Sequence, residues 1–143
     1  MTRALDLDGR VLRARVRRIR ELLATVPALG RIDPPRLVDE PVTALAAERL
    51  LTVLIELAFA CNRDVAVEVL GRAPASYPAS FDLAAQAGLI SADLAARLRP
   101  SAALRDVLVL DTDPGRVALA VPQVPALYGE YVRQATAFLA ERR

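Results

Sequence analysis

The chain has 143 residues, which suffices for one domain with its own hydrophobic core, and we expect a single domain over residues 1–143. Hydrophobic residues make up 54% of the chain and aromatic residues only 4%, which predicts a mainly aliphatic core. The net charge of +2 is too small to indicate nucleic-acid binding by itself. With no histidine and one cysteine, the chain has no set of ligands for a zinc or copper site, and we expect neither metal nor cofactor.

No segment of the sequence has the length and composition of a membrane anchor. The arginine-rich N-terminus lacks the apolar region of a signal peptide, and the longest apolar stretch, residues 50–61, is too short to span a bilayer. We therefore expect a cytoplasmic protein without a membrane partner. Cys61 ends this apolar stretch and is predicted to be a buried, reduced thiol.

The first predicted helix covers about residues 8–28. Leu12, Val16 and Ile19 recur at spacings of three and four, so they form one apolar stripe. Arginines occupy another face of this helix: Arg10, Arg13, Arg17 and Arg20. Two interpretations of that face stay open, a solvated surface or a patch for RNA or an acidic partner. Gly30, Pro34 and Pro35 predict a break in the helix.

The second predicted helix runs from Pro41 to about residue 70 and ends at Gly71. Its middle is apolar nearly all round, which predicts a central position with neighbours on several sides. A loop over 74–78 and a short helix over about 79–87 follow. Ser91 is expected to cap a fourth helix, in which Pro100 predicts a kink or a break.

Residues 107–121 allow two interpretations. Two valine-rich runs flank Asp113-Pro114-Gly115, which is typical of a β-hairpin, although no third strand is visible to support one. The alternative is continued helix. A last helix is predicted over about 125–141, with Leu127, Tyr131, Ala135 and Phe138 inward. Taken together, the pattern predicts an all-α, up-and-down bundle of about five helices.

Arg105 and Asp106 are the only polar residues between 102 and 110. Neighbours on a helix point about 100° apart, so we expect these two not to pair with each other. If buried, each needs a partner from elsewhere, because an unpaired buried charge is costly. A two-fold axis could supply one, with Arg105 of one subunit against Asp106 of the other. An exposed helix edge, where both charges meet water, is the other interpretation.

Several blocks in this order resemble the HepT-like group of the HEPN superfamily, which are bacterial toxin-like proteins. The resemblance covers roughly residues 40–112. It rests on Arg49-Leu50-Leu51 leading to Glu56, on Cys61-Asn62-Arg63-Asp64-Val65-Ala66, on Ser76-Tyr77-Pro78-Ala79-Ser80-Phe81, on Ala87-Gly88-Leu89-Ile90-Ser91, on Leu94-Ala95-Ala96-Arg97-Leu98 and on Arg105-Asp106-Val107-Leu108-Val109.

The resemblance implies a homodimeric helical bundle whose two subunits share a site that cleaves RNA without metal, using arginine and histidine. It also implies a small nucleotidyltransferase antitoxin that can attach AMP to a motif tyrosine. Arg105 takes the place of the arginine and Asp106 that of the polar residue. Leu110 stands in the place of the histidine and Thr112 in that of the tyrosine. Leucine cannot transfer a proton, so we expect ribonuclease activity to be absent or very weak.

Three functional interpretations follow. The leading one is a HepT-like component of a toxin–antitoxin-type module with a degenerate ribonuclease motif, acting by binding a nucleotidyltransferase partner or RNA. The second is a weakly active, metal-independent ribonuclease that uses Arg105 with Asp106 or Asp111. The third is a nucleotide-binding helical domain that serves a nucleotidyltransferase.

Overall fold

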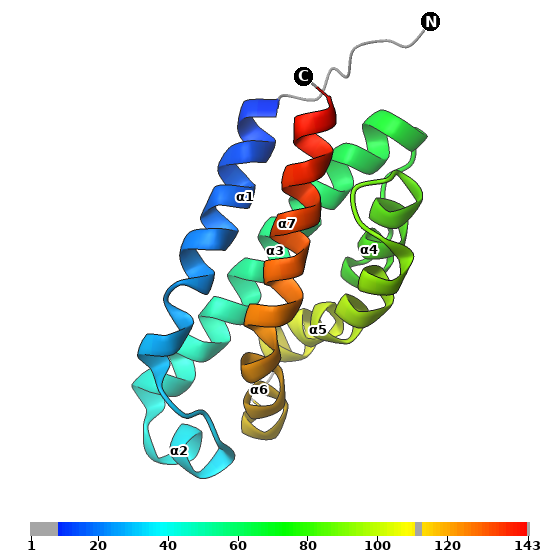
Figure 1. Ribbon diagram of the computed structural model, residues 1–143. Coiled ribbons are helices and arrows are strands. Elements are labelled where there is room, and N and C mark those ends of the chain that lie inside the picture. The colour runs from blue at the N-terminus through cyan, green and yellow to red at the C-terminus, as the bar shows by residue number, and fades with distance from the viewer. Residues whose placement is uncertain (1–8, 111–112, 143) are drawn as a thin grey trace, which may run out of the picture.

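The computed structural model describes residues 9–110 and 113–142, except for the side chain of Val109. Over these residues the chain forms seven α-helices, two short 3-10 helices and no strand (Figure 1). The α-helices are α1 (Gly9–Leu23), α2 (Pro34–Asp39), α3 (Pro41–Leu70), α4 (Tyr77–Gln86), α5 (Ala92–Leu110), α6 (Pro114–Ala120) and α7 (Val124–Glu141). The predicted all-α class is confirmed. The five longest helices are the five expected, and α2 and α6 are short additions.

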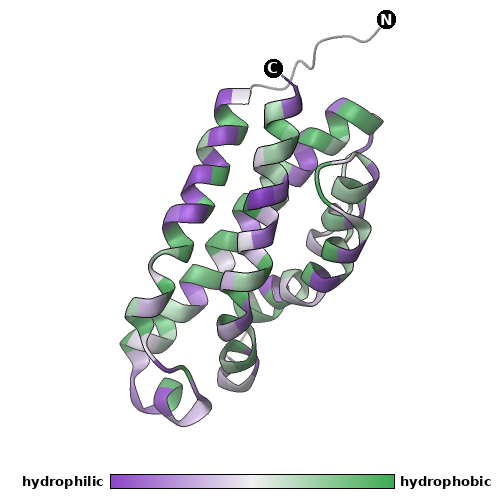
Figure 2. Ribbon diagram, viewed as in Figure 1, coloured by the Kyte–Doolittle hydropathy of each residue, from purple (hydrophilic) through white to green (hydrophobic). Residues whose placement is uncertain are grey.

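The long helix α3 lies at the centre of the bundle and packs against α1, α4 and α5. On α1, Leu12, Val16 and Ile19 are buried, as predicted, and Figure 2 shows much of the rest of this helix as hydrophilic. α3 begins at Pro41 and ends at Gly71, as its sequence predicts, because Gly71 takes the left-handed conformation with φ 67°.

The core is mainly aliphatic, but its largest members are aromatic. Tyr128 and Tyr131 on α7 and Phe81 on α4 are fully buried. The inward positions predicted for the last helix are confirmed, since Leu127, Tyr131, Ala135 and Phe138 are all buried. Four of the six aromatic residues of the chain, these three largest core members and Phe138, therefore fill central positions between helices.

The region between α1 and α3 differs from the prediction. α1 ends at Leu23, five residues early, and a 3-10 helix over Val26–Leu29 follows. Pro27 has no N–H to donate to the carbonyl of Leu23, which favours an end to the α-helix here. The predicted break then contains α2, which Asp33 caps by accepting a 2.9 Å hydrogen bond from the backbone N–H of Arg36.

The break considered at Pro100 is not present, since α5 continues through it from Ala92 to Leu110. One missing backbone hydrogen bond is tolerated because Leu98 and Ala102, on either side of the proline, are fully buried. Ser91 caps this helix, as predicted, by accepting a 3.1 Å hydrogen bond from the N–H of Leu94. The helix before it, α4, starts at Tyr77, two residues earlier than predicted.

The hairpin interpretation of residues 107–121 is wrong for the part that the structure describes. α5 extends to Leu110, and α6 covers Pro114–Ala120. Asp113 caps α6 by accepting a 3.1 Å hydrogen bond from the N–H of Arg116, with Pro114 in the first turn. Among the described helices, none is both long and apolar enough to cross a membrane.

Candidate functional site: the Arg105 cluster

Arg105 lies where the buried stripe of α5 reaches the surface. Leu94, Leu98 and Ala102 precede it on the same face and are buried in the core. The side chain of Arg105 keeps 27% of its surface exposed. Its guanidinium carbon lies 4.8 Å from the centre of the Tyr77 ring, at the start of α4. This cation–π contact fixes the position of the guanidinium against the bundle.

Two carboxylates face the guanidinium of Arg105. Its Nη2 lies 3.6 Å from Oε2 of Glu56 on α3, and its Nη1 lies 3.6 Å from Oδ1 of Asp106. Both distances exceed that of a hydrogen bond, so these are ion pairs only. The Nε atom is buried and has no hydrogen-bond partner among the described residues. We refer to Arg105, Glu56, Asp106 and Tyr77 as the Arg105 cluster.

The expectation that Arg105 and Asp106 do not pair with each other is wrong. The flexible arginine side chain spans the angular separation between neighbouring positions, so its guanidinium reaches the adjacent carboxylate. Glu56 supplies the partner from elsewhere, and it comes from the same chain. The sequence predicts no role for Glu56 or Tyr77 beyond their place in the family resemblance. The signal for Glu56 was its position as the one acidic residue in the apolar stretch 50–61.

The motif continues from Arg105 to the end of α5. Leu110, which stands in the place of the histidine, is 88% exposed and contributes no titratable group. Asp111 and Thr112 lie outside the described residues. One guanidinium facing two carboxylates gives the cluster a net negative formal charge, which repels a phosphate group. The described part of the motif therefore contains no side chain that ordinarily titrates near neutrality, as the family's histidine does.

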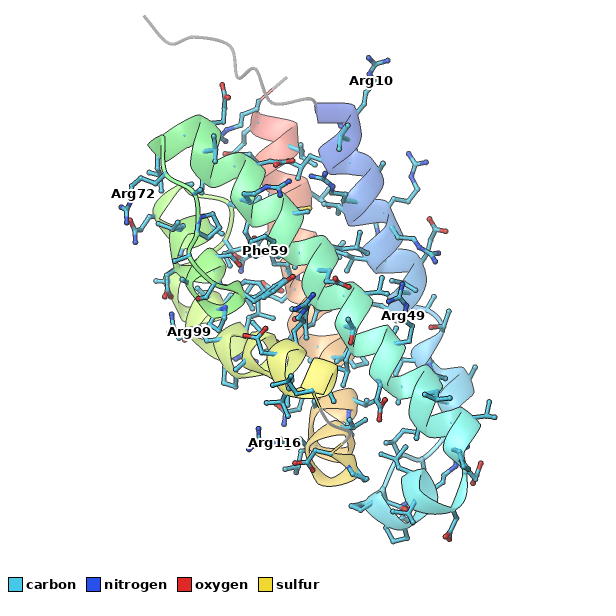
Figure 3. All side chains as sticks on the ribbon, turned by 180° about the vertical axis from the view of Figure 1, so that it is seen from behind. Arg10, Arg49, Phe59, Arg72, Arg99 and Arg116 are labelled. Carbon is cyan, nitrogen blue, oxygen red and sulfur yellow. The ribbon has the colours of Figure 1, made fainter. Side chains whose placement is uncertain are left out.

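Aromatic and apolar side chains continue the surface beside the cluster. Phe59, one turn along α3 from Glu56, packs against Tyr77 with ring centres 4.5 Å apart and ring planes tilted by 47°. Figure 3 labels Phe59 and shows α3 and the end of α5 on this side of the molecule. Val53 and Ala60 on α3 and Leu108 on α5 are only half-buried. The cluster thus lies within a surface of mixed apolar and charged character.

The arginines of α1 fall into two groups. Arg13, Arg17 and Arg20 line a groove of about 230 Å³ between α1 and α7, together with Val16, Thr136, Leu139 and Ala140. None of the described residues that line this groove is acidic. Arg15, in contrast, points toward α3 and forms an ion pair with Asp64. Arg15, which lies outside the predicted arginine face, is thus used within the fold, whereas Arg13, Arg17 and Arg20 of that face are exposed along the groove.

Cys61 is buried and free, as predicted. Burial raises the pKa of its thiol to about 12. Since the thiolate is the reactive form, this cysteine is chemically inert in the folded protein. Among the residues that the structure describes, no group of histidine, cysteine and acidic side chains is arranged to hold a metal ion.

The helical bundle and the arginine motif at the end of α5 together define a HEPN-type protein. The family model described as "Ribonuclease HepT-like" matches residues 13–111, which is more than half of the chain. The chain therefore belongs to the HepT-like ribonuclease family, within the HEPN superfamily. The match extends the resemblance beyond residues 40–112 to include most of α1. No curated protein matches the chain.

Proposed function

We propose that this protein is a HepT-like component of a toxin–antitoxin-type module that acts by binding rather than by cleaving RNA. The observation that carries the proposal is the composition of the motif. Arg105 is engaged by Glu56 and Asp106, and an exposed leucine, Leu110, stands where the family's histidine would be. General acid and base catalysis, commonly worth 10²–10⁴-fold in rate, has no histidine to supply it.

Incubation of the purified protein with total RNA, in the presence of EDTA, tests this proposal. We expect no cleavage above the buffer control. The matched variants are Arg105→Ala and Arg99→Ala, both on α5, because Arg99 pairs with Asp82 away from the cluster. Cleavage that persists in Arg99→Ala and disappears in Arg105→Ala would overturn the proposal. It would instead support the weakly active ribonuclease that uses Arg105 with Asp106 or Asp111.

The proposed partner is a small nucleotidyltransferase encoded beside this chain. Family membership supports this proposal, since a HepT-like protein is expected to have an antitoxin of that class. Co-expression and co-purification test it, and a pair that separates at micromolar concentration would contradict it.

If Thr112 accepts AMP in place of the family's tyrosine, incubation with this enzyme and ATP raises the intact mass by one AMP. An unchanged mass rejects the modification.

A second candidate is RNA binding without cleavage, which the groove between α1 and α7 favours. Arg13, Arg17 and Arg20 lie along one face of α1, and the described lining of the groove holds no acid that offsets their charge. Replacing all three by glutamine should weaken binding to single-stranded RNA and reduce the slope of log K against log salt by about 2. The matched control replaces Arg49, Arg99 and Arg116. Equal losses of RNA affinity in the two triple variants would contradict specific binding of RNA at this groove.

We further propose a homodimer through the α3–α5 surface that includes the Arg105 cluster. Half-buried Val53, Phe59 and Leu108 support it, because a dimer would cover them. The guanidinium of Arg105, whose two ion pairs are longer than hydrogen bonds, would gain the partner's Asp106. Light scattering should give the mass of a dimer, and Arg105→Leu should change its dissociation constant. A monomeric wild type ends this proposal.

A nucleotide-binding role, the remaining alternative, is tested by thermal shift with ATP and other nucleotides. Binding confined to the arginine groove would be weakened by the Arg13, Arg17 and Arg20 replacements and not by the control set. No shift at millimolar nucleotide counts against this alternative.

A further inference from the structure

A cavity of about 220 Å³ opens between α5, α6 and α7, away from the Arg105 cluster. None of the four residues of the cluster lines it. Figure 1 shows α6 beneath the start of α7, with α5 beside them. One wall comes from a single face of α5, where Arg97, Ser101 and Leu104 recur at helical spacing. The opposite wall comes from α6, the 3-10 helix Val121–Gln123 and the first turns of α7.

The interior of this cavity is apolar. Leu104, Val124 and Leu127 line it, and Tyr128 forms its floor. The hydroxyl of Tyr128 lies 2.9 Å from Oγ of Ser101, and that Oγ donates a 2.7 Å hydrogen bond to the carbonyl of Leu98. Tyr128 is therefore the donor to Ser101. Both hydroxyls are satisfied within the protein, so the interior offers a ligand mainly apolar contact.

The charged side chains in the described lining are both arginines. Arg97 and Arg116 line the cavity, and none of the described residues in the lining is acidic. Arg116 already forms an ion pair with Asp113, whose Oδ2 lies 3.3 Å from Nε of Arg116. Arg97 is exposed and makes no ion pair with any described residue. Gln123 donates its amide to the carbonyl of Leu119, which leaves its side-chain oxygen in the lining. An anion that approaches the cavity thus meets at least one guanidinium that no carboxylate of the described residues compensates.

We propose that this cavity binds a small amphiphilic monocarboxylate, with its alkyl chain against Leu104, Val124 and Leu127 and its carboxylate at Arg97. The size of the cavity limits the ligand. Its 220 Å³ corresponds to about seven water molecules at ~30 Å³ each, below the range of ~300–1,000 Å³ that is typical of drug-sized ligands. A straight chain of six to eight carbons, such as hexanoate or octanoate, is of suitable size. The site is independent of the motif on α5 and of any RNA cleavage.

Calorimetric titration with butyrate, hexanoate and octanoate tests the proposal. Each added methylene that enters the cavity should tighten binding about fourfold. Octanol, which has the chain without the charge, should bind more weakly than octanoate. Affinity that is independent of chain length, or equal for octanol and octanoate, would overturn the proposal.

Two variants with a matched control locate the site. Arg97→Gln should weaken octanoate binding about tenfold or more, because a charge-assisted contact is lost. Ala120→Phe should abolish it by filling the cavity from α6. Arg99→Gln, two residues along α5 and paired with Asp82 outside the cavity, should bind as the wild type does. Octanoate bound equally by the wild type and both cavity variants would show binding elsewhere and reject the site. Arg97 is exposed, so Arg97→Gln keeps the test valid even if Ala120→Phe fails to fold.

Discussion

Arg105 on α5 lies 3.6 Å from Glu56 on α3, and this ion pair connects the arginine of the motif to the central helix of the bundle. The same guanidinium contacts Asp106 and the face of Tyr77. It therefore joins three helices, α3, α4 and α5, at the surface. This arrangement gives the arginine a structural role that does not depend on catalysis.

Arg105→Ala should lower the free energy of unfolding by about 1 kcal/mol. The variant loses a partly exposed cation–π contact and two ion pairs, and it leaves two carboxylates facing each other. Arg99→Ala, whose pair with Asp82 is more exposed, should cost about half as much or less. Urea unfolding at pH 7 measures the free energy of unfolding of both variants. Equal effects of the two variants would show that the Arg105 cluster contributes no more than an ordinary surface pair.

Leu110→His tests what the motif lacks. Because Leu110 is 88% exposed, the histidine should be accepted with little loss of stability. We expect RNA cleavage to rise by 10²-fold or more above wild type, since a group that titrates near neutrality returns to the motif. Fluorogenic RNA without added metal provides the assay.

Two further variants make the Leu110→His experiment specific. The double variant Leu110→His, Arg105→Ala should lose the gained activity, because the arginine stabilises the charge that develops on the phosphate. Leu119→His places a histidine at another exposed leucine, on α6, and should gain nothing. No gain in Leu110→His, or an equal gain in Leu119→His, would mean that more than the histidine separates this site from an active one.

Much of the fold is predictable because helix ends carry local signals. Gly71 ends α3 and Ser91 caps α5 at the positions that the sequence indicates. Asp113-Pro114-Gly115 shows the limit of this approach. Asp-Pro-Gly suits a hairpin turn as well as a helix start, and only tertiary packing selects the helix of α6. The same signal, Asp33-Pro34-Pro35, produces α2, which the prediction missed.

The candidate site was predictable only where its residues form a local pattern in the sequence. Arg105 and Leu110 are recognised from a pattern within one helix. The partners of Arg105 come from residues 28 and 49 positions away in the chain, Tyr77 and Glu56. No local rule connects them, because their proximity depends on how α3, α4 and α5 pack. The cavity at Arg97 likewise combines residues from three helices and has no sequence signature.

Tyr131→Phe should destabilise the protein by about 1–3 kcal/mol. The hydroxyl of Tyr131 donates a 2.7 Å hydrogen bond to Oδ1 of Asn62, and both residues are fully buried. Removal of the hydroxyl leaves this amide oxygen without that donor in the core. Tyr128→Phe is the matched control, because its partner Ser101 lies beside the cavity and is only half-buried. A Tyr131→Phe cost no greater than the control's would contradict this role of Asn62.

Stability should fall in alkaline solution, beginning near pH 9. Burial raises the pKa of the Cys61 thiol from 9.0 to about 12, and burial also raises the pKa values of Tyr128 and Tyr131 above 10.0. Between its unfolded and folded pKa values, each group keeps its proton in the folded chain and loses it in the unfolded chain. The unfolded state thus binds fewer protons, and stability decreases as pH rises, by at most about 1.4 kcal/mol per pH unit for each group.

Urea unfolding at pH 7, 9, 10 and 11 measures this decrease, and Cys61→Ala separates the thiol from the tyrosines. This variant should be less stable at pH 7, because it leaves a small cavity, but it should lose less stability than the wild type between pH 9 and 10. Above pH 10 the tyrosines titrate in both proteins, but the wild type should still lose stability more steeply up to pH 11, because the folded thiol keeps its proton up to about pH 12. A wild-type stability that is constant from pH 7 to 11 would mean that these hydroxyl and thiol groups ionise within the folded core.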